Sequence, residues 1–161
     1  MNKPLLLLLP GVLALTSLVP PAYKTYHNAR FGYHIDYPAD FRPQPESDNG
    51  DGRRFLSADG QTVLTAYAGY NALDGGLAAD RRIARQGWQQ KHATLTLDQL
   101  TRTGYVLSGQ VKGRIFYEKT ILKTNTLTTF LWEYPVARKA AMDAVILHTI
   151  QTLQPSVANE E

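Results

Sequence analysis

Apolar residues alternate with small or polar residues over residues 31–37, and a proline ends the alternation. A period of two is typical of a strand with one buried face, so this segment predicts a strand. Residues 55–57 and 61–70 predict a second pair of strands, because the Asp59-Gly60 sequence between them favours a hairpin turn. Residues 39–54 are rich in Pro, Asp, Gly and Asn and predict a loop.

Two segments repeat their apolar positions with the spacing of a helix. Residues 76–92 predict an amphipathic helix that is capped near Asp74. A last helix is predicted to begin at Pro135 and to end before Pro155. The apolar positions are Leu77, Ile83, Ala84 and Trp88 in the first helix and Met142, Val145, Ile146, Ile150 and Leu153 in the second.

Four short segments between these helices have the composition of strands and are separated by turn residues. Consecutive strands joined by short turns form an antiparallel meander, onto which the two helices can pack. The order of elements therefore predicts the α+β class, with a central antiparallel sheet flanked by helices and no internal repeat. The four segments are residues 93–98, 104–110, 114–123 and 126–134.

The first 22 residues have the order of a secretory signal peptide, with one cation at Lys3, an apolar run over residues 5–19, and Ala22 at the end. Pro10 interrupts the run, which is shorter than the roughly 20 residues of a spanning helix. We therefore expect cleavage, and contact with a membrane only through this segment if it stays uncleaved. The expected organisation is a signal peptide (1–22), one α+β domain (23–155) and a flexible tail (156–161).

Composition narrows the classes of function. The chain has 161 residues, 43% of them apolar, which suits one domain with one core. Its formal charge of +3 is too small for a nucleic-acid-binding surface, which needs clustered cations. The absence of cysteine excludes disulfides, thiolate nucleophiles and a lipidated N-terminal cysteine. We expect a free protein of the bacterial periplasm or exterior.

The stretch SDNGDGRRFLSADG (residues 47–60) raises the question of a calcium loop, which needs oxygen ligands at fixed positions. A loop that begins at Asp48 has glycines at two ligand positions, and one that begins at Ser47 ends on an alanine. Turn chemistry with a hairpin is therefore the preferred interpretation. Asp48, Asp51 and Asp59 remain the candidate ligands of an irregular cation site.

No catalytic motif is found. The four histidines are dispersed without metal-ligand spacing, and there is no Gly-x-Ser-x-Gly sequence. Residues 50–55 lack the third glycine of a dinucleotide-binding sequence, and residues 104–109 are followed by Gln110, where a phosphate-binding loop needs a lysine. We therefore expect no cofactor. The chain is therefore predicted not to be an enzyme. An uncharacterised periplasmic hydrolase that uses His27 or His34 beside a serine or a carboxylate is kept as an alternative.

Two sets of residues are candidates for binding. Arg81, Arg82 and Arg85 give the first helix a basic face that suits an anionic partner or simple solvation. Several aromatic residues lie on predicted strands, and a surplus beyond the core could line a groove for a peptide. Tyr117 and Trp132 are the specific candidates for such a surface.

The segments YHNARFGYHIDYP, NGDGRRF, SADG and GRIFYEK, with YP before the last helix, resemble exported bacterial proteins of the PsbP-like and DcrB-like group. The resemblance covers residues 26–155 and implies a central antiparallel sheet sandwiched between helices. Relatives in this broad group act by binding proteins: a photosystem II extrinsic subunit, a nuclear-import factor that binds the Ran GTPase, and adaptors for secreted effectors. No catalytic residue carries over from them.

These observations predict a non-catalytic accessory module that binds an envelope protein or a peptide segment. The binding surface would be the sheet or the loop over residues 42–54. A periplasmic protein that binds a small ligand or a cation is the first alternative, and the hydrolase is the second. The oligomeric state stays open.

Overall fold

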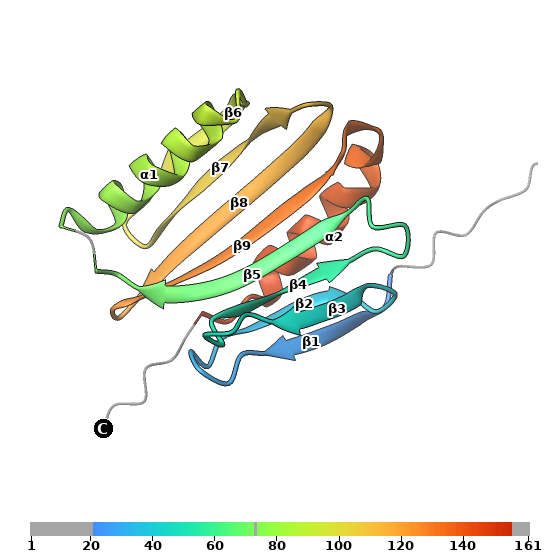
Figure 1. The fold of residues 1–161 in the computed structure, drawn as a ribbon, viewed down its shortest axis with the longest axis horizontal. Coiled ribbons are helices and arrows are strands. Elements are labelled where there is room, and N and C mark those ends of the chain that lie inside the picture. Colours follow the sequence, from blue (N-terminus) through green and yellow to red (C-terminus); the bar gives the residue numbers. More distant parts are fainter. Residues whose placement is uncertain (1–20, 73, 156–161) are drawn as a thin grey trace, which may run out of the picture.

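The computed structural model describes residues 21–72 and 74–155, so nearly all of the expected signal peptide and the tail lie outside the described residues (Figure 1). Within them, nine strands and two α-helices follow one another. They are β1 (Tyr23–His27), β2 (His34–Pro38), β3 (Arg42–Glu46), β4 (Gly52–Leu56), β5 (Val63–Tyr70), α1 (Gly76–Gln90), β6 (Thr94–Leu100), β7 (Gly104–Val111), β8 (Arg114–Lys123), β9 (Thr126–Pro135), a 3₁₀ turn (Val136–Arg138) and α2 (Lys139–Thr152).

Seven strands form one antiparallel sheet in the order β3-β4-β5-β9-β8-β7-β6, while β1 and β2 form a separate hairpin. The predicted meander of β6 to β9 is confirmed, and β8 covers the predicted residues 114–123. The sequence also predicted the hairpin between β4 and β5, where Ser57 N donates to Thr62 O at 2.9 Å. β5 joins the two halves of the sheet through β9.

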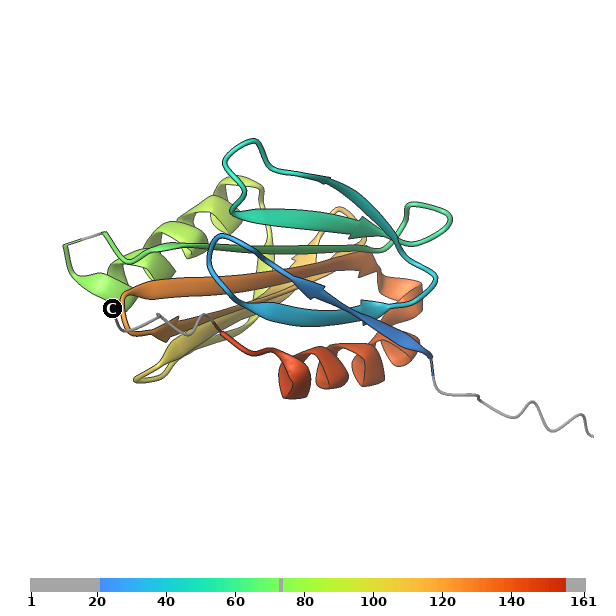
Figure 2. The ribbon, with the colours of Figure 1, turned by 90° about the horizontal axis from the view of Figure 1, so that it is seen from below.

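Each helix covers a different half of the sheet on a different face. We call the face packed against α1 the front face and the other the back face. α1 packs on β6 and β7, whereas α2 packs on β9 and on β2 of the hairpin (Figures 1 and 2). On β8, Ile115 points to the back face and Phe116 to the front face, as alternation along a strand requires. The result is an α+β fold with a core on either side of the sheet.

The two cores differ in size. The back core gathers 18 buried residues from the hairpin, the sheet and α2, whereas the front core gathers six. The predicted apolar stripe of α2 is confirmed, since Met142, Val145 and Ile146 are buried in the back core. The front core consists of Leu77, Trp88, Tyr105, Leu107, Phe116 and Leu127.

Two strands lie where the sequence predicted none. β3 falls inside the predicted loop over residues 39–54. The sequence predicted a loop there because Pro43 and Pro45 are typical of loops, but a strand at the edge of a sheet, such as β3, tolerates proline. β1 lies next to the expected cleavage site and has only one buried residue, Tyr26, so its pattern is weak. α1 begins close to the predicted cap at Asp74, but its N-cap is the next residue, Gly75, whose φ of 94° favours glycine and which makes no side-chain capping bond.

The β1–β2 hairpin is held in place by contacts with α2 and with Gln154, which follows α2. His34 and Gln154 exchange two backbone hydrogen bonds, of 3.1 Å and 3.0 Å. His148 of α2 bonds through Nε2 to Asp36 Oδ2 at 2.9 Å, and its ring stacks on Tyr23 at 3.6 Å between centroids. The first and last described elements are therefore packed together.

Among the described residues, neither helix has the length and apolar character needed to cross a membrane.

Candidate functional site

The turn over residues 47–52 is closed by its own side chains. Ser47 Oγ lies 2.5 Å from Asp51 Oδ1, and Asn49 Nδ2 donates to Asp51 Oδ2 at 2.8 Å. Gly50, with φ of 67°, accepts through its carbonyl a 2.9 Å bond from the amide of buried Asn28. These bonds use the polar atoms of the turn to fix its shape and to tie it to the β1–β2 hairpin.

The candidate cation ligands do not converge. Asp59 lies in the next turn, at the other end of β4, and a five-residue strand spans about 16 Å. There Asp59 forms an ion pair with Arg138, and its hydrogen bonds with Ser57 and Gln61 hold its pKa well below the usual range. Nowhere in residues 21–72 and 74–155 do three His, Cys, Asp or Glu side chains gather closely enough to hold a metal ion.

The basic face of α1 is partly neutralised. Arg81 and Arg85 both pair with Asp98 of β6, at 2.5 Å and 3.1 Å. These bonds fasten α1 to the sheet. Arg82 is exposed and forms no ion pair with the described residues. A binding role for this face therefore stays a prediction.

The two aromatic candidates have different positions. Trp132 is fully buried in the back core, so its proposed place on a binding surface is wrong. The cause is the alternation of β9, which turns Trp132 inward beside Phe130. Tyr117 is partly buried and borders a hollow of about 360 Å³ on the back face, so it stays a candidate.

The front core contains a carboxylate, Glu118, for which the sequence alone favoured a solvated position on a strand. Glu118 of β8 is 5% exposed and lies on the same face as Phe116. Trp88 Nε1 donates to Glu118 Oε2 at 2.6 Å, and the hydroxyl of Tyr105 lies 3.3 Å from Oε1. The Trp88 ring stacks on Phe116 at 3.7 Å between centroids, which fixes the indole donor. Residues of α1, β7 and β8 thus hold one carboxyl group.

The hydroxyl of Tyr105 lies between two carboxyl groups, at 2.9 Å from Asp80 Oδ2 and 3.3 Å from Glu118. A phenol has one proton to donate, so it cannot donate to both. Burial raises the pKa of Glu118, against the opposing effect of its bonds from Trp88 and Tyr105. A neutral Glu118 that donates to Tyr105, which in turn donates to Asp80, satisfies all three groups.

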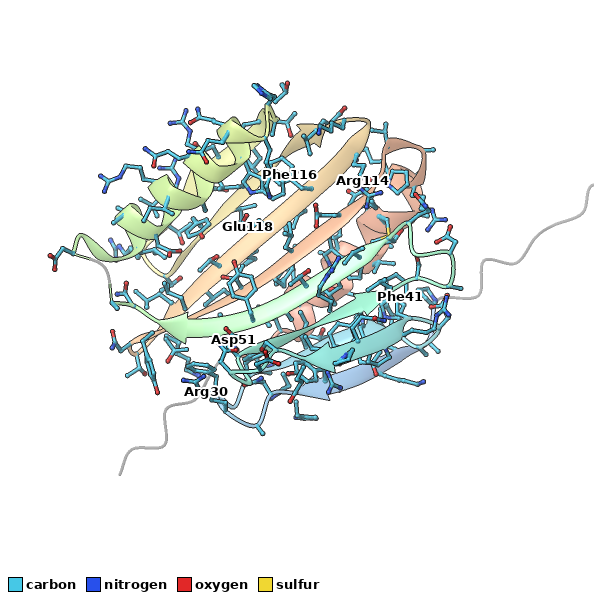
Figure 3. The ribbon with its side chains drawn as sticks, in the orientation of Figure 1. Arg30, Phe41, Asp51, Arg114, Phe116 and Glu118 are labelled. Atoms are coloured by element: carbon cyan, nitrogen blue, oxygen red, sulfur yellow. The ribbon has the colours of Figure 1, made fainter. Side chains whose placement is uncertain are left out.

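This network borders a hollow of about 400 Å³ on the front face, between α1 and β5, which we call the front groove. The charged residues that line it are Asp51, Asp80 and Glu118, with no cation among the described residues. In Figure 3, Glu118 lies near α1 and Asp51 across β5. Tyr67 is 40% exposed and borders both the groove and a neighbouring hollow of about 370 Å³.

The electrostatics of the groove disfavour further negative charge. Burial, followed by the nearby charge of Glu118, raises the pKa of Tyr67 to about 12. The same two causes raise the pKa of Tyr105. Both phenols therefore stay protonated near neutral pH. Tyr67 offers an exposed ring beside the acidic side chains, whereas Tyr105 is buried and its hydroxyl is held between Asp80 and Glu118.

The histidines lie elsewhere. His27 and His34 face each other on the hairpin with ring centroids 5.1 Å apart, and His92 is exposed after α1. His148 is paired with Asp36 on the back face. Within the described residues, no histidine lines the front groove.

Comparisons with known proteins bear on the fold. No protein-family model and no curated protein matches the sequence. The solution structure of cyanobacterial PsbP (CyanoP) from Synechocystis sp. PCC 6803 matches with a TM-score of 0.63 and 14% identity, over 86% of this chain and 95% of that chain. A Bacteroides thetaiotaomicron crystal structure matches with a TM-score of 0.46 and 13% identity, over 80% of this chain and 47% of that chain. The likeness to CyanoP shows that this chain has the PsbP-like fold.

Proposed function

We propose that this chain is an exported, non-catalytic accessory module that binds a peptide segment of an envelope protein in the front groove. A lysine or arginine of that segment lies beside Asp80 and Glu118, and the neighbouring part of the segment packs on Tyr67. The observation that carries this proposal is that every charged residue lining the groove is acidic, while two of its tyrosines, Tyr67 and Tyr70, stay exposed.

The chemistry of the groove supports a cationic side chain. Asp80 is partly exposed and holds one bond, from Tyr105, so the carboxylate keeps capacity to accept from an ammonium or guanidinium group. The ring of Tyr67 offers a face on which such a cation can also rest. Glu118 is buried behind them, and an incoming cation stabilises its charged form.

The groove has features of binding more than of catalysis. Its buried acid, Glu118, is held by Trp88 and Tyr105, which are fixed in the front core. A general acid or base needs a reacting partner within reach, and no histidine or serine of the described residues lines the groove. Export is supported by the charge and apolar pattern of residues 1–22.

A small cationic ligand is the second candidate, because a volume of about 400 Å³ falls within the range of small-molecule pockets. Such a ligand would use the same Asp80 and Glu118 contacts. Unlike the peptide, a small ligand would not extend past Tyr67 into the neighbouring hollow.

The test places a photoactivatable crosslinking amino acid at Tyr67 in cells that export the protein, with the same amino acid at Leu147 as control. Leu147 is 54% exposed on α2, which packs on the back face. We expect the Tyr67 position to capture one envelope protein reproducibly, with the crosslink mapped to a segment that contains a lysine or arginine. Asp80→Asn should reduce the capture several-fold.

Capture that is equal at both positions, or that ignores Asp80→Asn, would refute the peptide function. In that case a rise in melting temperature with small amines, lost in Asp80→Asn, would support the second candidate.

A further inference from the structure

The two edges of the seven-stranded sheet are protected to different degrees. β3, at one edge, has Pro43 and Pro45 and a register shift after Pro43, and each proline removes a backbone donor. β6, at the other edge, has no proline, and in the described part of the chain it pairs with β7 alone. Its register shifts between Leu95 and Leu97, and the pairing is regular from Leu97 to Leu100. This regular segment of β6 is better suited than β3 to accept a further strand.

The free donors of that edge follow from the pairing with β7. Thr101 N donates to Gly104 O at 2.8 Å, so these two residues form a hydrogen-bonded pair in register with the strands. Hydrogen-bonded and non-bonded pairs alternate in an antiparallel ladder. The N–H groups of Leu100 and Asp98 therefore point away from β7, toward solvent.

The two faces of β6 differ beside this edge. Asp98 lies on the front face, where it binds Arg81 and Arg85 of α1. Leu97 lies on the back face opposite Ser108 and is 41% exposed. Leu100, opposite Tyr105 and 42% exposed, shares the front face with Asp98. A strand added next to β6 would thus have arginines and Leu100 beside one face and Leu97 beside the other.

Charge decides which occupant fits. Arg82 and Arg85 are exposed on α1, Lys91 follows α1, and Arg102 follows β6, while Asp98 is the one acid of β6 and of the turn that follows it. A second copy that paired through its own β6 would bring the same cations against these, which costs energy. An acidic segment would be attracted instead.

We propose that the outer edge of β6 is a docking site for an extended segment of a partner protein in which acidic and apolar residues alternate. The segment adds an eighth strand, with its backbone on the free groups of β6. Its acidic side chains face Arg82 and Arg85, and its apolar side chains pack beside Leu97. This surface is separate from the front groove and has the opposite charge preference.

The test titrates the full-length protein into a fluorescent peptide of about ten residues that alternates glutamate and valine. A peptide of the same composition, with its glutamates in one block, is the control for register. We expect saturable binding of the alternating peptide, at least about tenfold tighter than that of the block peptide, because alternation alone places each residue type on its own face. NMR hydrogen exchange should show slower exchange of the Asp98 and Leu100 amides in the complex.

Variants then locate the site. Leu100→Pro removes one outward N–H and should weaken binding about tenfold or more, while circular dichroism and melting temperature report whether the fold is kept. Arg82→Glu, at an exposed position that leaves the fold intact, should weaken binding several-fold, whereas Lys24→Glu, the same charge change on β1, should not. Asp80→Asn in the front groove should also leave binding unchanged, so this surface and the proposed function are tested independently.

Equal affinity for the two peptides, or equal loss in Arg82→Glu and Lys24→Glu, would overturn the proposal. A dimer detected by sedimentation and abolished by Leu100→Pro would also overturn it, because the occupant would then be a second copy of the chain.

Discussion

The front and back faces of the sheet bury side chains of different chemistry. Behind the sheet, α2 and the hairpin cover aromatic and aliphatic residues such as Phe55, Phe130 and Trp132, which are all fully buried. In front, α1 covers a smaller core that includes a carboxyl group, Glu118, and it leaves β5 beside an open groove. Both faces belong to the same strands, so alternation along the chain separates the two roles.

The difference indicates that the back face contributes most of the stability, whereas the front face carries the polar groups that a ligand can reach. A large apolar core supplies most of the favourable free energy of folding, in proportion to the area it buries. A buried acid contributes little and costs desolvation unless it is paired or neutral. We therefore expect substitutions on the back face to affect stability first and substitutions on the front face to affect pH response and binding.

The largest effect should come from Phe130→Ala. Phe130 is fully buried in the back core, and its removal leaves a cavity, so we expect a loss of about 3–5 kcal/mol in unfolding free energy. Leu131→Ala is the matched control, since Leu131 is the next residue of β9, points to the front face and is only partly buried. Its expected loss is about 1 kcal/mol. Equal losses in urea unfolding would contradict the division between the faces.

Glu118→Ala should have the next largest effect. It leaves the indole donor of Trp88 without its partner in a buried site, while the hydroxyl of Tyr105 keeps its bond to Asp80, so we expect a cost of about 1–3 kcal/mol. Glu118→Gln keeps an acceptor for Trp88 and a donor for Tyr105, and we expect it to cost less than about 1 kcal/mol. Unfolding curves of the two variants at one pH decide this, and equal losses would show that the network contributes nothing.

The pH dependence of stability should also distinguish the faces. Burial makes the pKa of Glu118 higher in the folded chain than its ordinary value of 4.5. The stability due to this difference is fully present below pH 4.5 and is lost as the pH rises through the folded pKa. The excess stability of the wild type over Glu118→Gln should therefore fall in urea titrations as the pH rises above 4.5 and through the folded pKa. A constant difference would mean that Glu118 is ionised in the folded protein as in the unfolded chain.

The smallest effect concerns the ion pairs of the two helices. Asp98→Asn weakens two ion pairs between α1 and β6 that are partly shielded from solvent, and we expect a loss of about 1 kcal/mol. Asp143→Asn weakens an exposed pair with Lys139 inside α2 and should cost about 0.3 kcal/mol or less. Thermal unfolding at low and high salt measures both losses. A larger loss in Asp143→Asn would reverse the expected order.

Much of the back face could be predicted from sequence, because its pattern is local. The alternation in β8 and β9 and the stripe of α2 each lie within one element. β3 was missed because its prolines are compatible with a strand only at the edge of a sheet, and its place in the sheet depends on distant residues.

The front site depends on contacts that sequence patterns do not show. Trp88 and Glu118 are 30 residues apart, and the amphipathic pattern of α1 explains Trp88 as an ordinary core residue. One signal was available in the sequence. Glu118 lies two residues after Phe116, and residues two apart on a strand share a face, so this acid is on the same face as a core aromatic residue. The function of Trp132 was misjudged for a related reason, since strand phase alone does not say which face a helix will cover.

The pairing of His34 with Gln154 has a consequence for the order of events in folding. Synthesis runs from the N-terminus, so the hairpin emerges long before the last helix that it packs against. Such contacts between chain ends form late, because the intervening chain must first be brought together. The back core therefore cannot close until α2 is available. A chain cut before Gln154 should lose the two backbone bonds with His34 and hold the hairpin less firmly against α2.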